Sequence, residues 1–249
     1  MKKNYWIRLF SLLFAIVLMM ACTTTAFADF GYSDNKYETV DGIEYYFYSL
    51  IHNEVKGQIN FQTTIAPTDR DATIPTGAMG VCAKLYKSSG ALVTSTEWDY
   101  SDWTNGTQVL LQSDSYTPTA GGFFYSQGQV KIYNGKGYTT FTSYATANFT
   151  TRSSMPPVDV PVTKNENGEI YGSELFLNQI GVHPDLILVE GIDGTVGYVR
   201  SNELNNDGVL TPADAIESMK NRENRLIPVY MSDGETVIGL YEISMGKSK

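Results

Sequence analysis

Five runs of β-branched and aromatic residues, separated by glycine-containing turns, dominate the stretch between residues 42 and 144. The runs are GIEYYFYSLIHN, GQINFQTTIAP, MGVCAKLYKSSGALVTST, TQVLLQSDSY and FFYSQGQVKIYNGKGYTTFTSY. Several alternate polar with apolar residues, as strands with one buried face do, and pairs such as Ser89-Gly90 and Asn134-Gly135 are typical of tight reversals. The sequence therefore predicts a mainly β fold, with an antiparallel β-sandwich domain over residues 29–150.

A proline-rich segment, residues 151–164, follows these runs. Its prolines at positions 156, 157 and 161 cannot sit inside a continuous sheet, and they favour an extended spacer. We therefore expect a linker here and a second domain after it.

Residues 165–249 combine strand patterns with one helical pattern. The runs PDLILVEG and TVGYVR flank Asp193-Gly194 as one hairpin, and LIPVYM and TVIGLYEI flank a second turn. Between them, TPADAIESMKNREN places Ala215, Ile216 and Met219 on one side of a short amphipathic helix. This part predicts a small α+β domain.

Residues 1–28 read as a signal peptide. Three basic residues precede an apolar run, and Ala26-Phe27-Ala28 offers small residues where a signal peptidase cleaves, before Asp29. The alternative is a lipidated Cys22 after Met19-Met20-Ala21, which would attach the protein to a membrane. An uncleaved membrane helix is disfavoured because the apolar run is shorter than the roughly 20 residues that a bilayer requires.

Charge and cysteine content narrow the functional classes. Loss of the signal peptide leaves 15 of the 18 Lys and Arg residues against 27 Asp and Glu, a formal net charge of −12. An acidic chain is a poor partner for nucleic acid or anionic membranes, which need clustered basic residues. Cys82 then remains as a single cysteine, which excludes an intramolecular disulfide. Its aliphatic surroundings favour a buried thiol over a nucleophile.

The segment ELNNDGVLTPAD has the spacing of a calcium-binding loop. Glu203, Asn205, Asp207 and Asp214 would occupy the first, third, fifth and twelfth positions. Both end residues depart from the pattern, which begins with Asp and ends with Glu. Calcium is the one cofactor that the sequence suggests, and it is not favoured.

A helix start explains the same segment with fewer departures. Thr211 would be the N-cap, Pro212 the first helical residue and Asp214 the third, completing a capping box. Asp207 would then belong only to a turn, so we expect Thr211→Ala to cost more stability than Asp207→Ala.

Catalytic motifs are absent from the sequence. His52 and His183 belong to no zinc-binding or nucleophile-elbow pattern. The segment TEWDYSDWTNGT is more suggestive, because Trp98, Tyr100 and Trp103 among carboxylates would suit an exposed platform for sugar rings. We favour packing in the core for Trp98 and Tyr100, because residues two apart along a strand point to the same face.

The segments NENGEIYGSEL, PDLILVEGIDGTVGYVRSNEL and IPVYMSDGETVIGLYEI resemble a C-terminal module of exported, uncharacterised proteins of Gram-positive bacteria. The stretch from Gly197 to Leu204 is also similar to the signature of bacterial SH3-type wall-binding domains, which implies a ligand-binding role for Tyr198. These resemblances imply an exported protein of a cell envelope.

We therefore expect a secreted or envelope-associated, non-enzymatic protein that binds wall polymer or another carbohydrate. A secreted effector that acts on another cell's surface, or that inhibits an enzyme, is the alternative, and a hydrolase is the third reading. The expected partners are a carbohydrate or a protein, with no nucleic acid and no membrane unless Cys22 is lipidated.

Signal-peptide cleavage is directly testable. Protein recovered from culture medium or cell envelope should begin at Asp29, as read by N-terminal sequencing and intact mass. A mass that fits a diacylated Cys22 at the N-terminus would contradict this prediction.

Overall fold

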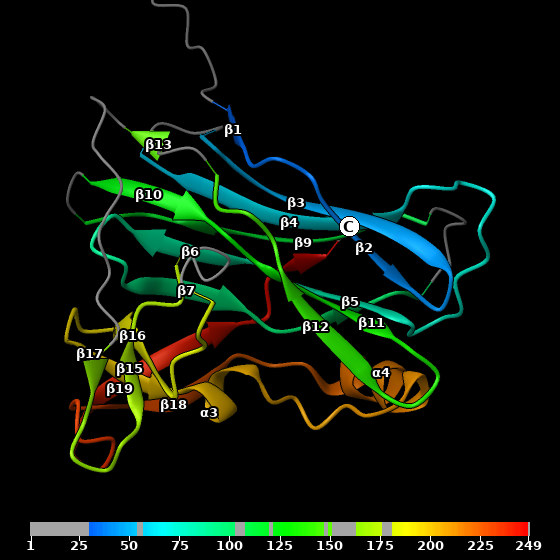
Figure 1. Ribbon diagram of the computed structural model, residues 1–249. Coiled ribbons are helices and arrows are strands. Elements are labelled where there is room, and N and C mark those ends of the chain that lie inside the picture. The colour runs from blue at the N-terminus through cyan, green and yellow to red at the C-terminus, as the bar shows by residue number, and fades with distance from the viewer. Residues whose placement is uncertain are drawn as a thin grey trace, which may run out of the picture.

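The computed structural model describes residues 30–53, 57–102, 108–119, 122–146, 149–150, 163–175 and 181–248 (Figure 1). The expected signal peptide, and residues 151–162 of the expected linker, lie outside them. The elements are β1 (Phe30–Tyr32), β2 (Lys36–Val40), β3 (Ile43–His52), β4 (Ile59–Pro67), β5 (Met79–Cys82), β6 (Lys84–Lys87), β7 (Leu92–Thr96), β8 (Asp99–Tyr100), β9 (Leu110–Tyr116), β10 (Phe123–Ser126), β11 (Gln129–Tyr133), β12 (Tyr138–Thr142), β13 (Phe149–Thr150), β14 (Thr163–Lys164), β15 (Ile170–Gly172), β16 (Leu186–Glu190), β17 (Val196–Arg200), α3 (Ser201–Asn205), α4 (Pro212–Ser218), a 3-10 turn (Met219–Asn221), β18 (Arg225–Tyr230), β19 (Val237–Ser244) and β20 (Lys247–Ser248).

Strands dominate the described residues, which confirms the mainly β prediction. The expected hairpins β6–β7, β11–β12, β16–β17 and β18–β19 all form as antiparallel pairs. Within the described part of the chain, no helix is both long and apolar enough to cross a membrane.

The upper layer in Figure 1 is a six-stranded antiparallel sheet in the order β1–β3–β4–β9–β20, with β2 also paired to β3. Strand β3 shows why it forms one side of a core. Its odd-numbered Tyr45, Phe47 and Ile51 are buried, whereas Tyr46 and Tyr48 are only half-buried. This alternation with period two directs one face of the sheet inward.

A second sheet, in the order β12–β11–β5–β8, packs beneath the first. Phe47 and Ile65 of the upper sheet share a buried cluster with Met79, Val130 and Ile132 of the lower one. Each such side chain contributes about 1.5–3 kcal/mol when fully buried, so the contact between these two sheets is a major source of stability.

Apart from β20, the strands after residue 165 join a third, ten-stranded sheet that contains strands of both parts of the chain. One edge of strand β7 pairs with β6, and the other pairs in parallel with β19 through Ser95 and Thr96 and with β16 through Leu92. Because β16, β17, β18 and β19 are paired in succession, these five strands form a closed ring. Leu92, Val189, Val199, Val229 and Tyr241 fill a shared cluster in this region. The C-terminal strands therefore complete their ring with a strand from the N-terminal part.

Helix α4 is also packed against the N-terminal part. Ala215 is buried with Trp98, Tyr100 and Cys82 in one cluster. Gly77, at φ +79°, makes this approach possible, because a β-carbon there would lie 2.5 Å from the carbonyl oxygen of Pro212. A larger residue at position 77 would push the helix away.

We expect residues 29–150 to fold poorly alone, because the described strands before residue 150 bury Lys84 and Lys131 against carboxylates of the C-terminal part. Removing one member of a buried ion pair costs about 3–5 kcal/mol. Near-ultraviolet circular dichroism of the fragment should show lost tertiary packing, and co-expression of residues 151–249 should restore it. Cooperative unfolding of the isolated 29–150 fragment would contradict this interdependence.

Candidate functional site

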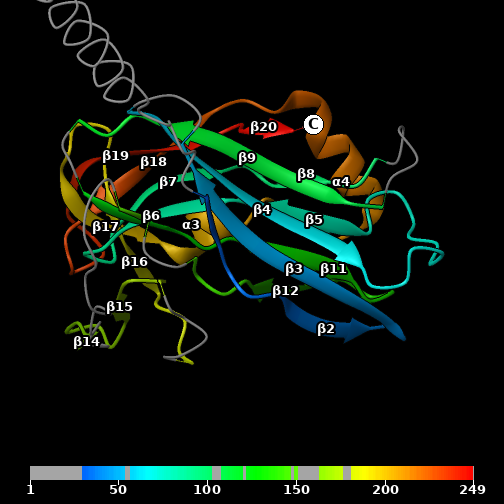
Figure 2. The same ribbon diagram turned by 90° about the horizontal axis from the view of Figure 1, so that it is seen from above.

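The six-stranded sheet turns one of its faces away from the core. In Figure 1 it is the upper side, and Figure 2 looks down on it, with β3, β4 and β9 across the view. Since the odd-numbered residues of β3 point inward, Tyr46, Tyr48 and His52 point outward. We call this surface the outer face.

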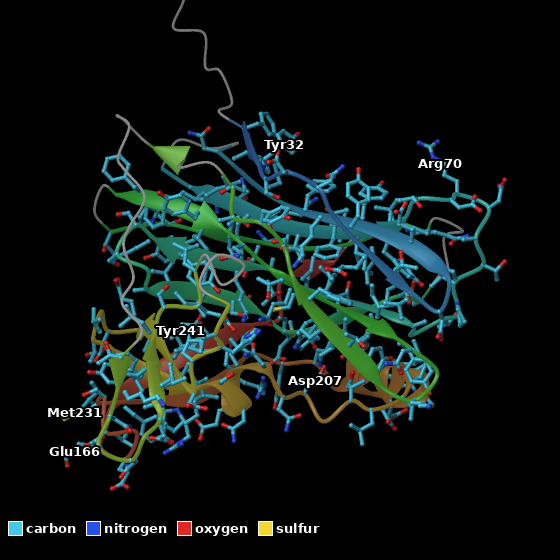
Figure 3. All side chains as sticks on the ribbon, in the orientation of Figure 1. Tyr32, Arg70, Glu166, Asp207, Met231 and Tyr241 are labelled. Atoms are coloured by element: carbon cyan, nitrogen blue, oxygen red, sulfur yellow. The ribbon has the colours of Figure 1, made fainter. Side chains whose placement is uncertain are left out.

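A row of aromatic rings lies along one end of the outer face. Phe30 and Tyr32 of β1 are 54% and 56% exposed, and their ring centroids lie 6.3 Å apart. Phe30 also stacks on the His52 ring at 4.9 Å, and Tyr32 lies 6.3 Å from Tyr48. Figure 3 shows Tyr32 on the outer side of the sheet. Stacking therefore aligns these rings as a continuous aromatic surface.

Uncharged polar side chains continue the outer face beside this row. The strand register places Asn60 opposite His52, Gln62 opposite Leu50 and Thr64 opposite Tyr48. On the next strand, Ser113 pairs with Gln62 and Ser115 with Asn60. Gln62 donates to the Thr64 hydroxyl at 2.9 Å. The Asn60 amide nitrogen is buried and has no hydrogen-bond partner among the described residues.

A hollow of about 460 Å³ adjoins the other end of the outer face. It is lined by Tyr46, Ala66, Pro67, Thr68, Arg70, Gln108 and Val109. The carbonyl oxygen of the Gln108 side chain is buried there without a partner in the described structure. Arg70, labelled in Figure 3, is an exposed cation beside it. The hollow thus adds a buried acceptor and an exposed cation beside the outer face. That face carries charges of its own, because the exposed Glu44 shares the outward parity of Tyr46 on β3 and the Lys247 ammonium of β20 donates to the Ser115 hydroxyl at 3.0 Å.

Trp98 and Tyr100 are not part of an exposed platform, which corrects that hypothesis for these two residues. They are only 4% and 2% exposed and pack with Cys82, Val209 and Ala215. The Lys131 ammonium lies 4.2 Å from the centre of the Trp98 ring. Both rings pack in the same buried cluster as Ala215 of α4, so neither is available to stack on a sugar. Trp103 lies outside the described residues.

The hydroxyl of Tyr100 donates to Asp207, and Lys131 forms an ion pair with the same carboxylate at 2.8 Å. Burial, followed by the charge of Asp207, raises the pKa of Tyr100. The phenol therefore stays protonated and remains a hydrogen-bond donor in this network.

Tyr198 is half-buried on β17, where its ring meets Tyr171 edge-on at 5.2 Å. Tyr198 also pairs with Tyr230 of β18 across the sheet. It is distant in the fold from the outer face, so a ligand site at Tyr198 would be a separate one. That role stays a prediction.

The four residues with calcium-loop spacing each have a different partner. The Glu203 carboxylate accepts from the Tyr230 hydroxyl, the Asn205 carbonyl from Lys84, and Asp207 from Lys131 and Tyr100. Asp214 accepts from the backbone and hydroxyl of Thr211. Within the described residues, no three His, Cys, Asp or Glu side chains are grouped so as to hold a metal ion.

The predicted capping box is confirmed. The Thr211 hydroxyl accepts from the Asp214 backbone N–H, Asp214 accepts from the Thr211 N–H at 2.9 Å, and Pro212 opens α4. Hydrogen bonds from Thr211 hold the pKa of Asp214 below its usual value. The structure also adds the short helix α3 before the turn, where the sequence indicated only the end of a strand.

Sequence reasoning missed the outer face, although its signal was present. In the run EYYFYSLIH the tyrosines at 46 and 48 share one parity with His52, while Tyr45 and Phe47 share the other. Aromatic residues occupy both faces of this strand, so the alternation of polar and apolar residues could not show which face is exposed. The pairing of β1 onto β3, which adds Phe30 and Tyr32, has no local signal in the sequence.

Searches of protein-family models, of curated proteins and of solved structures find no match to this chain.

The ion pair of Asp207 reverses the expected order of two substitutions. Asp207→Ala should lower the free energy of unfolding by about 3–5 kcal/mol, because it leaves Lys131 buried without its counter-charge. Thr211→Ala should cost about 0.5–2 kcal/mol, through loss of the cap. Urea denaturation with and without chelator measures both. A melting temperature that rises with calcium in the unaltered protein, and not in Asp207→Ala, would instead establish a metal site.

Proposed function

We propose that this chain is a secreted or envelope-associated binding protein without enzymatic activity, whose ligand is a carbohydrate held on the outer face. The N-terminal part would act as a β-sandwich binding domain. The observation that carries the proposal is the aromatic row of the exposed Phe30 and Tyr32 and the half-buried Tyr48, beside a strip of amides and hydroxyls.

The two halves of this surface match the two sides of a sugar ring. The C–H groups of a pyranose present an apolar face, which stacks on aromatic rings and is attracted to their negative π-faces. Its hydroxyls both donate and accept hydrogen bonds, as do the side chains of Asn60, Gln62 and Ser113. Ring centroids spaced at 6.3 Å along the row offer contact to more than one sugar residue, which favours a polymer over a monosaccharide.

The charge of the surface favours a neutral polysaccharide. Around the aromatic row the outer face is built from aromatic, amide and hydroxyl side chains, and the charged groups on or beside it, Glu44, Lys247 and Arg70, are of both signs rather than one. An anionic wall polymer would be repelled by a chain whose formal net charge is −9 even before processing. The same residues supply no pair of carboxylic acids, so binding is favoured over glycoside hydrolysis.

Binding to insoluble polysaccharide tests the proposal. Phe30→Ala and Tyr32→Ala should each weaken pull-down by neutral wall glycan several-fold to about tenfold, the loss expected for one stacking ring. Because both rings are exposed, the thermal midpoint should change little.

Tyr144→Ala is the matched control, because Tyr144 is an exposed tyrosine whose ring faces Lys36 and is not part of the aromatic row. It should bind as the unaltered protein does. Full binding by a Phe30→Ala/Tyr32→Ala/Tyr48→Ala variant would refute the outer face as the site. Loss of binding in Tyr198→Ala alone would move the site to β17.

A further inference from the structure

Three side chains with complementary chemistry meet inside the protein where the N-terminal strands contact the C-terminal part. Lys84 comes from β6, Glu174 follows β15, and Asn205 ends α3. The Lys84 ammonium nitrogen lies 2.7 Å from a Glu174 carboxylate oxygen and 2.9 Å from the carbonyl oxygen of the Asn205 side chain. The side chains of Lys84 and Glu174 are each only 1% exposed. The amine and the carboxylate are thus held away from water, and the half-buried amide lies within hydrogen-bond distance of the amine.

The surroundings fix this arrangement. Leu175 and Leu204, the chain neighbours of Glu174 and Asn205, are buried in the same apolar cluster as Tyr86 and Tyr241. Glu174 also accepts from the Tyr86 hydroxyl at 3.3 Å and from the Gln129 amide at 3.1 Å. Burial, and next the charge of Glu174, raise the pKa of Tyr86, so that its hydroxyl remains a donor.

The amide of Asn205 is also oriented. Its nitrogen donates to the Ser201 hydroxyl at 3.3 Å, which turns the carbonyl oxygen toward Lys84. The amine is therefore positioned next to the carbonyl group rather than next to the amide nitrogen. Such fixed proximity can replace a large part of the activation barrier of a reaction between two groups.

We propose that Lys84 and Asn205 form an intramolecular isopeptide bond, with Glu174 as the proton acceptor. The Lys84 ammonium gives a proton to the Glu174 carboxylate, and the resulting neutral amine attacks Cγ of Asn205. The Nζ–Cγ bond forms and the Cγ–Nδ2 bond breaks. One amine proton passes to the departing nitrogen, which leaves as ammonia. Atoms and charge balance without an oxidant, a metal or an added reactant.

Burial of the ion pair favours this proton transfer. Two opposite charges removed from water incur a large desolvation cost, and transfer of one proton along the 2.7 Å contact neutralises both. The product amide is uncharged and suits the interior better than the ion pair does. The Gln129 and Tyr86 donors remain to bind Glu174 before and after the step.

The bond would link positions that are distant in sequence and adjacent in the fold. It would tie β6 of the N-terminal part to the helix that leads from the closed ring toward α4. A cross-link of this kind restricts the unfolded chain as a disulfide does, and the free cysteine of the described residues, Cys82, offers no such link. Reducing agents would not break it.

Intact mass spectrometry of the purified full chain tests the proposal. With the N-terminus established by sequencing, the mass should fall below the sequence mass by one molecule of ammonia. Trypsin should fail to cut after Lys84, and a branched peptide should join residues 71–87 to residues 201–220. An unaltered protein with its full sequence mass would overturn the proposal, and Lys84 and Glu174 would then be an ordinary buried ion pair.

Variants locate the bond and its proton acceptor. Lys84→Arg, Asn205→Ala and Glu174→Gln should each restore the full mass, corrected for the substitution, and should migrate more slowly than the unaltered chain under denaturing electrophoresis. Asn206→Ala is the matched control, because the neighbouring amide binds the Gly208 N–H and not Lys84, and it should keep the deficit. A deficit that persists in Asn205→Ala would assign the bond to another amide and refute this one. The mass of the unaltered chain decides the question even where a variant does not fold.

Discussion

The contact between two buried lysines of the N-terminal strands and two carboxylates of the C-terminal part determines how the rest of the structure is held. Lys84 meets Glu174, and Lys131 meets Asp207, at 2.7 and 2.8 Å. A buried charge without a partner costs several kcal/mol, so each strand that carries one of these lysines requires the later segment that neutralises it. The apolar clusters do not impose such a requirement, because a hydrophobic side chain can be buried by many neighbours.

The closed ring also links the N-terminal strands to the C-terminal part. Strand β7 continues directly from the hairpin that contains Lys84, and it supplies the fifth side of the ring formed by β16 to β19. The ring buries Tyr241, whose position among the C-terminal strands is seen in Figure 3. The outer face, at the opposite side of the molecule, is held at a distance from these charges.

Local sequence patterns predicted individual hairpins and the start of helix α4, but they did not predict which distant strands pair with one another. Strand runs with glycine turns gave the hairpins, and the Thr211 to Asp214 pattern gave the cap of α4, because each depends on residues close in sequence. Residues 79–87 are divided between β5 and β6, which belong to different sheets, and no local pattern in the sequence predicts this division. The parallel pairing of β7 with β16 and β19 was also unpredictable, since it joins segments that are far apart in the sequence. The candidate site was missed for the same reason: two of its rings arrive on β1, which pairs with the far end of β3.

The parallel pairing of Ser95 and Thr96 with Ile243 and Ser244 has a consequence for how the chain reaches its native state. Contacts between such distant positions give the protein a high contact order. Folding is then slow, because long loops must close at a cost in chain entropy before the contacts can stabilise the structure. A polypeptide that emerges N-terminus first, from a ribosome or a translocation channel, presents β7 long before β19 exists. The edge of that strand must stay unpaired through synthesis, and it is then the segment most exposed to association with other nascent chains.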